Sequence, residues 1–323
     1  MAMFLLIKVL IIVQNIAGSR PKIDSKSSQS AEWSYDGKRG PGPNQWPGIC
    51  NTGTLQSPID INSQNATKIE EKPFIFHGYD ILTPKNAKLE NNGHTVQITF
   101  ENQQRISLSG GGLSGNYTLL QFHFHWGQKN IKSKGSEHKI DGNAYPLELH
   151  MVHSKSEYDG IDKPNKDGLA VLGIFFKIQE KDNMDLNNFI SISLEKVQRD
   201  DIENVQPFTL EKLLPRNTDM FYRYYGSLTT PPCDEIVIWT IFKDPVGISK
   251  SQLREFHKLF QESFFKFKKD TTKKLKNNFR PEQDLNSREV FDVDTSIKKF
   301  SNGSLLTNNF NLIMISIIFL KKF

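Results

Sequence analysis

Two short histidine-bearing segments carry the residue types with which this sequence could do chemistry. Residues 121–126 are Gln-Phe-His-Phe-His-Trp, and residues 148–152 are Glu-Leu-His-Met-Val. Side chains alternate between the two faces of a strand, so His123 and His125 share one face of the first segment. If the two strands are neighbours in an antiparallel sheet, His150 joins them and three imidazoles converge. Three histidines with a fourth position left open are typical of a catalytic zinc site, so the segments predict a Zn2+ cofactor.

Two polar residues accompany these histidines on the same strand faces. Gln121 stands two residues before His123, and Glu148 stands two residues before His150. The outward ring nitrogen of a metal-bound histidine is usually held by an amide, a carboxylate or a carbonyl, so we expect Gln121 and Glu148 to orient the imidazoles. The alternative is a hydrogen-bonded or surface pair without a metal, because short motifs often match by chance. The other histidines without such companions are expected to be structural: His77, His138, His153 and His257.

A third segment, residues 224–232, predicts a rigid loop that carries hydroxyl groups. Its sequence is Tyr-Tyr-Gly-Ser-Leu-Thr-Thr-Pro-Pro, in which glycine permits unusual φ and two prolines stiffen the exit. Such a loop can hold a hydroxyl in one orientation. The alternative is an ordinary turn whose hydroxyls face water.

Short β-favouring runs separated by turn residues must position these segments. We expect strands at 88–100, 105–108, 117–126, 145–154, 169–178 and 236–242. The best helix candidates, 187–197 and 249–260, begin with the capping residues Asn187 and Ser249. Strands dominate and no internal repeat or linker divides them. The expected fold class is therefore mainly β (α+β), one domain with a few peripheral helices.

The chain of 323 residues is long enough for a large core, and its composition is ordinary for a globular protein. Its net charge of +5 is mild, and much of the excess lies in residues 264–276. Such a basic run contacts an anionic membrane surface or nucleic acid in some proteins and is a solvated face in others. Because no zinc-finger spacing or aromatic RNA-binding motif accompanies it, we expect no nucleic-acid partner.

Both ends of the chain have the character of targeting segments. Residues 1–19 contain a short apolar stretch followed by small residues, which predicts a signal peptide, with a buried core segment as the alternative. Residues 20–30 form a polar linker before the domain at 31–297. Residues 298–323 resemble a GPI-attachment signal, with a tail anchor or an undocked end as alternatives. We therefore expect a secreted protein, or one held on the extracellular face of the plasma membrane by a C-terminal lipid anchor.

Two cysteines, Cys50 and Cys233, agree with that location. An even pair in a secreted chain usually forms a disulfide, and the alternative is two buried free thiols. Acceptor sequences for glycosylation stand at Asn65, Asn116 and Asn302, and they fit the same compartment.

Together these segments resemble the α-carbonic anhydrase family, from about residue 33 to about residue 293. Six motifs follow the family order: 121–127, 135–138, 148–153, 169–175, 227–232 and 278–281. The resemblance implies a large twisted, mostly antiparallel central sheet with peripheral helices, and zinc at the base of a conical cleft. It implies that the domain hydrates carbon dioxide reversibly to bicarbonate and a proton by attack of zinc-bound hydroxide. Activated esters would be side substrates, and sulfonamides and anions would be inhibitors.

The resemblance also implies roles for individual residues, beginning with the three histidines as zinc ligands. Thr229 matches the threonine that accepts a hydrogen bond from zinc-bound hydroxide and donates one to a buried glutamate, here Glu137. His94 matches the proton-shuttle histidine, for which a plain surface histidine in an Asn-Gly turn is the alternative. The apolar pocket for carbon dioxide matches Val152, Val171, Leu228, Thr230 and Trp239. The positions that order solvent match Tyr35, Asn92 and Gln97. The disulfide of the secreted and membrane-bound members matches Cys50 and Cys233.

The sequence departs from the family pattern in places that affect the shape of the cleft. The loop between His125 and Glu137 is about two residues longer than usual, Tyr225 stands where proline is usual, and residues 154–166 are divergent. Residues 110–115 satisfy Gly-x-Gly-x-x-Gly, but a β-like segment follows, so we expect a hairpin connection and no dinucleotide site. A non-catalytic binding domain of the same fold would typically lack a zinc histidine, and all three are present.

Overall fold

The computed structural model describes residues 33–38, 40–83, 87–100, 106–128, 134–156, 167–190, 194, 202–204, 207–259 and 274–296. The strands are β1 (Asp60–Ile61), β2 (Thr67–Glu70), β3 (Phe74–His77), β4 (Lys88–Asn91), β5 (Val96–Thr99), β6 (Ser107–Gly110), β7 (Tyr117–Trp126), β8 (Lys139–Ile140), β9 (Leu147–Lys155), β10 (Leu169–Gln179), β11 (Ile202–Asn204), β12 (Met220–Gly226), β13 (Val237–Phe242), β14 (Val246–Ser249) and β15 (Phe291–Asp294). The helices are α2 (Ile49–Thr52), α3 (Met184–Phe189) and α4 (Lys250–Phe256), with 3-10 turns at Pro43–Gln45 and Leu210–Leu213.

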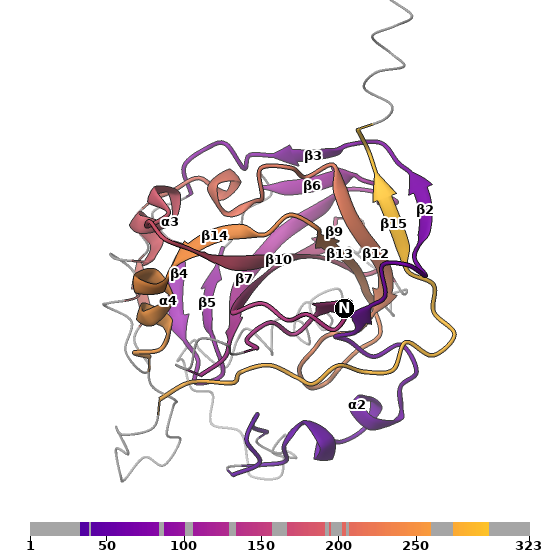
Figure 1. Cartoon of the computed structure of the whole chain (residues 1–323), viewed down its shortest axis with the longest axis horizontal. Coiled ribbons are helices and arrows are strands. Elements are labelled where there is room, and N and C mark those ends of the chain that lie inside the picture. Colours follow the sequence, from indigo (N-terminus) through magenta and orange to yellow (C-terminus); the bar gives the residue numbers. More distant parts are fainter. Residues whose placement is uncertain are drawn as a thin grey trace, which may run out of the picture.

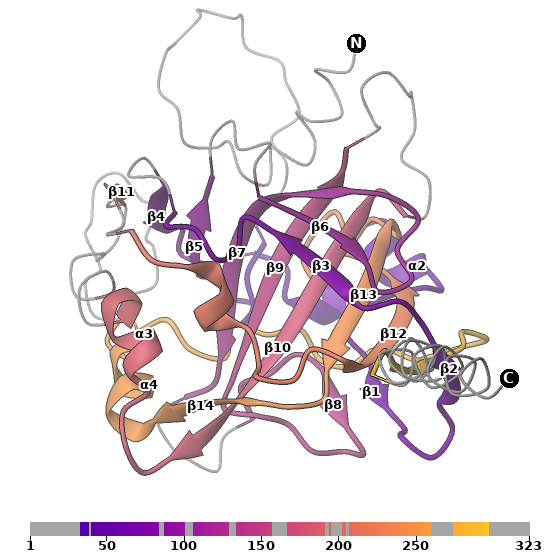
Figure 2. The same ribbon diagram turned by 90° about the horizontal axis from the view of Figure 1, so that it is seen from above.

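One continuous sheet contains all of these strands except β1 and β8, which pair with each other. Its main path runs β11-β4-β5-β7-β9-β10-β13-β12-β15-β2, with β14 beside β10 and β6 between β3 and β7. Most neighbours are antiparallel, whereas β10 is parallel to β13 and β14, and β15 is parallel to β2. Figure 1 and Figure 2 show the twist of the sheet from strand to strand, with α3 and α4 together at one edge. The predicted large, twisted, mostly antiparallel sheet with few helices is confirmed.

Alternation along the central strands separates an apolar core from a polar face. Phe122, Phe124 and Trp126 of β7 are buried in the same cluster as Leu149 and Met151 of β9. The side chains between them point to the opposite face of the sheet. A slip of one residue would exchange the two faces, and each buried large apolar side chain contributes about 1.5–3 kcal/mol. The core therefore determines the register that positions the polar face.

The strand predicted over 88–100 is instead two strands, β4 and β5, which pair antiparallel. In the turn between them, the side chain of Asn92 accepts hydrogen bonds from the amides of His94 at 3.0 Å and Thr95 at 2.9 Å. Gly93 has a φ of 81°, which glycine adopts without strain. The prediction of one strand was wrong because the Asn-Gly pair makes a turn more favourable than continued extension.

The helix predicted from Ser249 is present as α4. The Ser249 hydroxyl accepts a hydrogen bond from the amide of Gln252 at 3.1 Å, and the Gln252 side chain accepts one from the Ser249 amide at 3.1 Å. This reciprocal arrangement satisfies two donors that the first turn of a helix leaves free. Within the described residues the helix ends at Phe256.

The helix predicted over 187–197 begins three residues early, so the choice of Asn187 as its cap was wrong. Asn183 caps α3, because its side chain accepts a hydrogen bond from the amide of Asp185 at 3.1 Å. Asn187 lies inside the helix and accepts a hydrogen bond from Gln252 at 2.6 Å. Two capping-type residues four positions apart compete, and the tertiary contact decides between them.

The glycine-rich segment 110–115 connects β6 to β7, its antiparallel neighbour, as expected of a hairpin. Several predicted segments lie outside the described residues, and their predictions remain untested: the signal peptide 1–19, the linker 20–30, residues 264–273 of the basic run, the acceptor site Asn302 and the tail 298–323. Among the described residues, no helix has the length and apolar character needed to cross a bilayer.

Candidate active site

The three histidines singled out in the sequence lie together on the polar face of the sheet. His123 on β7 is directly opposite His150 on β9, and His125 lies two residues farther along β7. The ring centroid of His123 lies 5.0 Å from that of His125 and 5.3 Å from that of His150. One ring nitrogen from each histidine lies within 4.8 Å of the other two. The three rings are therefore close enough to share one cation.

The outward nitrogens of two rings contact the polar residues that precede them. His123 Nδ1 lies 2.8 Å from Gln121 Oε1, and His150 Nε2 lies 2.8 Å from Glu148 Oε1. Because both oxygens are acceptors, each ring donates its outward N–H and keeps a lone pair on the inward nitrogen. The contacts orient both rings toward the same point.

The third ring is held by a main-chain oxygen that the sequence does not reveal. His125 Nδ1 lies 2.7 Å from the carbonyl oxygen of Asn278. The Asn278 side chain fixes this carbonyl in place, since its Oδ1 accepts the amide hydrogen of Trp126 at 2.8 Å and its Nδ2 donates to the oxygens of Phe124 (2.9 Å) and His94 (3.0 Å). A backbone acceptor 153 residues from its partner leaves no local signature.

Burial keeps all three imidazoles neutral. Burial, with a smaller contribution from the neighbouring His150, lowers the pKa of His125 to about 3. Burial likewise holds the pKa of His123 well below its usual value. It also lowers the pKa of His150, although the carboxylate of Glu148 opposes that shift. A neutral imidazole is the form that binds a metal ion.

The residues present fit a zinc ion. The inward nitrogens of two rings, His125 Nε2 and His150 Nδ1, lie 3.1 Å apart. Since each ring donates its other N–H to an oxygen, both inward nitrogens carry lone pairs that face each other. Two facing lone pairs repel unless a cation lies between them. Neutral nitrogen donors are among the ligands that zinc prefers.

A buried carboxyl lies beside these rings. Glu137 Oε1 accepts a hydrogen bond from the amide of Arg280 at 2.7 Å, and Glu137 Oε2 lies 3.4 Å from His125 Nε2. Burial raises the pKa of Glu137 well above its usual value, while hydrogen bonds from the Arg280 amide and the Thr229 hydroxyl oppose that shift. The Thr229 hydroxyl is therefore close enough to the Glu137 carboxyl to favour its charged form.

Apolar side chains lie beside the histidines, on the same face of the sheet, along β9, β10 and β13. Val171 on β10 is directly opposite Val152 on β9 and Trp239 on β13. All three are buried in one cluster, and Leu228 packs against it. Thr230, in the same loop as Leu228, is half-buried. The polar histidines therefore border an apolar wall.

Comparison with known proteins places most of the chain in one family. The family model described as eukaryotic-type carbonic anhydrase matches residues 41–294. This chain belongs to the eukaryotic-type carbonic anhydrases. Putative carbonic anhydrase 3 of Caenorhabditis elegans is 38% identical over 267 residues, which are 82% of this chain and 98% of that protein. Carbonic anhydrase 4 of Mus musculus is 36% identical over 270 residues, which are 82% of each chain.

The family also occurs within larger proteins. Receptor-type tyrosine-protein phosphatase zeta of Rattus norvegicus is 36% identical over 255 residues, which are 76% of this chain but only 11% of that protein. The present chain is comparable in length to the carbonic anhydrases, and it is an enzyme of that family, whose reaction is the hydration of carbon dioxide.

In this carbonic anhydrase, His94 is half-buried and stacks on an aromatic ring. Its imidazole lies 3.9 Å from the ring of Trp33, with 17° between the planes, and 6.4 Å from the ring of Tyr35. Burial, followed by the charge of Glu137, raises the pKa of Tyr35 well above its usual value. Tyr35 therefore neighbours His94 and lies close enough to the buried Glu137 carboxyl to be affected by its charge.

The other two residues predicted to order solvent occupy different settings. Gln97 is buried on β5 directly opposite His123. Asn92 lies in the β4–β5 turn, where its side-chain oxygen already accepts two amide hydrogens. The predicted acceptor sites Asn65 and Asn116 have exposed side chains.

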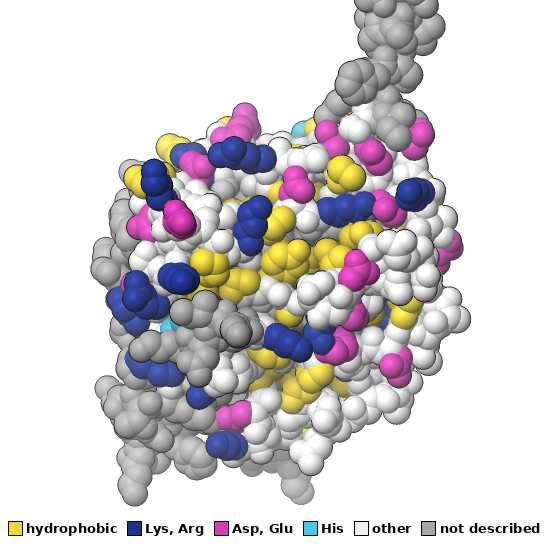
Figure 3. Space-filling model, viewed as in Figure 1, with side chains coloured by type: hydrophobic (Ala, Val, Ile, Leu, Met, Phe, Trp, Pro, Cys, Tyr) yellow, Lys and Arg dark blue, Asp and Glu magenta, His cyan; other side chains and the backbone are white. Residues whose placement is uncertain are grey.

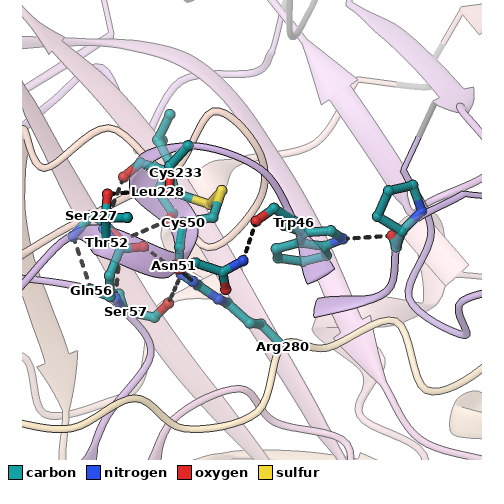
Figure 4. Close-up of a disulfide and its surroundings, with 12 residues drawn as sticks. Trp46, Cys50, Asn51, Thr52, Gln56, Ser57, Ser227, Leu228, Cys233 and Arg280 are labelled. Carbon is teal, nitrogen blue, oxygen red and sulfur yellow. Dashed lines mark hydrogen bonds between the residues drawn. A yellow bond between two sulfur atoms is a disulfide. The ribbon is translucent and has the colours of Figure 1, made fainter. Parts of the chain in front are cut away.

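The predicted disulfide between Cys50 and Cys233 is present. Figure 4 shows how it joins the N-terminal segment to the loop that carries Thr229. The Cys233 amide donates to the oxygen of Thr230 at 2.9 Å, and the Ser57 amide donates to the Ser227 hydroxyl at 2.9 Å. These contacts hold both ends of the loop in place.

Arg280 reinforces this junction from the other side. Its guanidinium donates to the oxygens of Cys50 (2.6 Å) and Ser57 (2.8 Å) and to Gln56 Oε1 (2.9 Å), and it lies over the ring of Trp46 (Figure 4). The same residue's amide binds Glu137. Arg280 therefore joins the disulfide region to the buried carboxyl.

His138, expected to be structural, lies directly behind His150. Its Nδ1 is 2.7 Å from Glu148 Oε1 and its Nε2 is 2.6 Å from the hydroxyl of Tyr224. Burial by itself would raise the pKa of Glu148, but the interactions with His138 and His150 hold it well below its usual value. Glu148 thus remains a charged acceptor, which the sequence alone did not connect to His138.

Proposed function

We propose that this carbonic anhydrase binds zinc through His123, His125 and His150 and uses it to hydrate carbon dioxide reversibly. The observation that carries the proposal is the meeting of three neutral imidazoles at one point, each held from behind by an oxygen acceptor. Zinc, when bound there, lowers the pKa of a water ligand to about 7 and so supplies a hydroxide nucleophile at neutral pH. Stopped-flow hydration assays on protein of measured zinc content test it. The rate should rise in proportion to zinc, and an undiminished rate after chelation would overturn the proposal.

Thr229 and Glu137 act as positioning groups in this proposal. Thr229 is proposed to donate its hydroxyl hydrogen bond to Glu137, so that it can only accept a hydrogen bond from the nucleophile. This restricts the nucleophile to the orientation in which its remaining lone pair faces the substrate, and orientation of this kind contributes strongly to rate. The loop contacts of Ser227 and Cys233 hold the Thr229 hydroxyl in a position from which it can make both hydrogen bonds.

Carbon dioxide has no dipole, so an apolar surface suits its binding. The pocket proposed for it is formed by Val152, Val171, Leu228, Thr230 and Trp239. The same site is proposed to hydrolyse activated esters and to bind sulfonamides and small anions. Disulfide formation supports an extracellular location, which we propose together with cleavage of residues 1–19 and lipid attachment directed by the tail 298–323.

Replacing Gly173 with valine should weaken zinc binding about 10- to 100-fold, the usual effect of disturbing a residue that orients a metal ligand. Gly173 lies directly opposite His150 on β10. A Cβ there would lie 2.6 Å from Ile241 and 3.2 Å from Glu148 Oε1, so the added side chain must displace the Glu148 carboxylate. Zinc affinity is measured by competition with a chromogenic chelator. Gly115→Val is the control, because a Cβ there meets only Lys155, at 3.7 Å. Unchanged affinity in Gly173→Val would show that Glu148 is not needed to orient His150.

Replacing His94 with alanine should slow turnover about 10²-fold in dilute buffer, at the low end of what a positioned proton-transfer group contributes. His94 is proposed to carry protons between the site and solvent, a task suited to imidazole because histidine side chains in general exchange protons near neutral pH. Added imidazole should restore turnover, and kcat should change more than kcat/KM. His77→Ala, which removes an exposed histidine, is the matched control. If the rate of His94→Ala did not depend on buffer concentration, another group would be the shuttle.

A further inference from the structure

A cavity lies beside α4. Its volume is about 450 Å³, and its lining residues are Gln128, Arg254, His257, Lys258, Lys274, Leu275 and Lys276. Figure 3 shows dark blue Lys and Arg side chains gathered at this edge of the molecule, next to a cyan histidine. None of the residues proposed for catalysis lines this cavity.

The charge of the lining is strongly unbalanced. Four of the seven lining residues are cationic, and none is acidic. Lys258 is paired with Glu255, with 2.6 Å between Nζ and Oε2. Arg254 and Lys276 form no ion pair with any carboxylate in the described part of the chain. Like charges held this close repel, and an anion between them relieves that repulsion.

The cationic groups are attached to a fixed frame. The Lys274 ammonium donates to the oxygen of Lys258 at 2.6 Å, and the Leu275 amide donates to the oxygen of Leu259 at 2.9 Å. The Trp126 indole donates to the oxygen of Leu275 at 3.2 Å. These bonds tie the segment 274–276 to the end of α4 and to the core, so the backbone that carries the cations is positioned before any ligand arrives.

We infer that this cavity binds a compact oxyanion with two or more negative charges, such as a phosphate group. Arg254 offers a planar set of donors that matches the geometry of such an oxyanion, and the lysines add charge. His257 and Gln128 supply further polar contacts. The phosphate can be free in solution or part of a lipid headgroup, because both present the same dianionic group. The inference does not depend on the zinc site.

Inorganic phosphate is the probe for the first experiment, observed by 31P NMR line broadening with the full-length protein at low ionic strength. Arg254→Gln combined with Lys276→Gln should weaken phosphate binding about tenfold or more, since the variant loses two charge-assisted contacts to the oxyanion. Carbon dioxide hydration by this variant should stay unchanged. Lys68→Gln combined with Lys181→Gln removes two exposed lysines elsewhere and should leave binding unchanged.

His150→Ala separates this cavity from the zinc site. Phosphate binding that survives in His150→Ala and is lost in the Arg254/Lys276 variant supports the inference, whatever the fate of hydration. Binding that is lost in His150→Ala and kept in the Arg254/Lys276 variant overturns it, as does equal loss in the lysine control. Flotation with phosphatidic acid vesicles, compared with phosphatidylcholine vesicles, shows whether the bound phosphate belongs to a lipid. Binding to phosphatidic acid vesicles alone, if it is lost in the Arg254/Lys276 variant, supports a lipid headgroup. Failure to bind both inorganic phosphate and phosphatidic acid overturns the inference.

Discussion

Alanine at position 150 is expected to remove zinc and carbon dioxide hydration together. His150 supplies one of the three nitrogens that converge within 4.8 Å, and two imidazoles alone hold zinc weakly. Hydration should fall at least about 10³-fold, because without the metal no hydroxide is available at neutral pH. Metal content is measured by mass spectrometry after dialysis, and hydration by stopped flow on the same samples.

Two controls distinguish loss of a ligand from loss of the fold. His77→Ala removes an exposed histidine that contacts Ser109 at 3.3 Å, and it should keep both zinc and activity. Far-UV circular dichroism of His150→Ala should match the parent protein, since His150 lies on the face opposite the main core. Full hydration by a metal-free His150→Ala protein would refute the assignment of the ligands.

Removing the disulfide is expected to have the largest effect on stability. Cys50→Ser combined with Cys233→Ser should lower the free energy of unfolding by about 3–5 kcal/mol, because the bond closes a loop across 183 residues of sequence. Both cysteines are buried, so the serine hydroxyls would also need new partners. The midpoint of urea denaturation, monitored by tryptophan fluorescence without reductant, measures the change.

Reduction of the parent protein provides the control for this variant. Parent protein in reductant should unfold at nearly the same urea concentration as the double serine variant, and the variant itself should not respond to reductant. Hydration should fall with stability, because Cys233 adjoins the loop of Thr229. A double variant with the midpoint of the untreated parent would show that the hydrogen bonds of Arg280 suffice to hold this junction.

Local patterns were sufficient for the parts of the fold in which one strand face is apolar. In β7 the alternation of Phe122, His123 and Phe124 determines which side chains enter the core, and the observed strand has the predicted bounds. Ser249 was a correct helix cap because the residues that complete the capping motif follow within three positions. The placement of Gln121 and Glu148 behind their histidines also follows from strand period alone.

Predictions failed where two local signals competed or where a residue's hydrogen-bond partner is distant in sequence. Asn92 and Gly93 interrupt a β-favouring run, and only the hydrogen bonds of the turn show that the chain turns there and does not continue as one strand. Asn183 and Asn187 are equally good caps by residue type. The role of Asn278 rests on a main-chain carbonyl, which every residue has.

The residue types and their alternation determined that three histidines would share one face of a sheet, because side-chain direction in a strand depends only on position parity. They also determined that an amide and a carboxylate would lie behind two of them. Only the tertiary structure decided that β7 and β9 pair with His123 opposite His150, and that Asn278, Glu137 and Thr229 surround the same point. Pairing register depends on packing the whole apolar face at once, and no segment carries that information by itself.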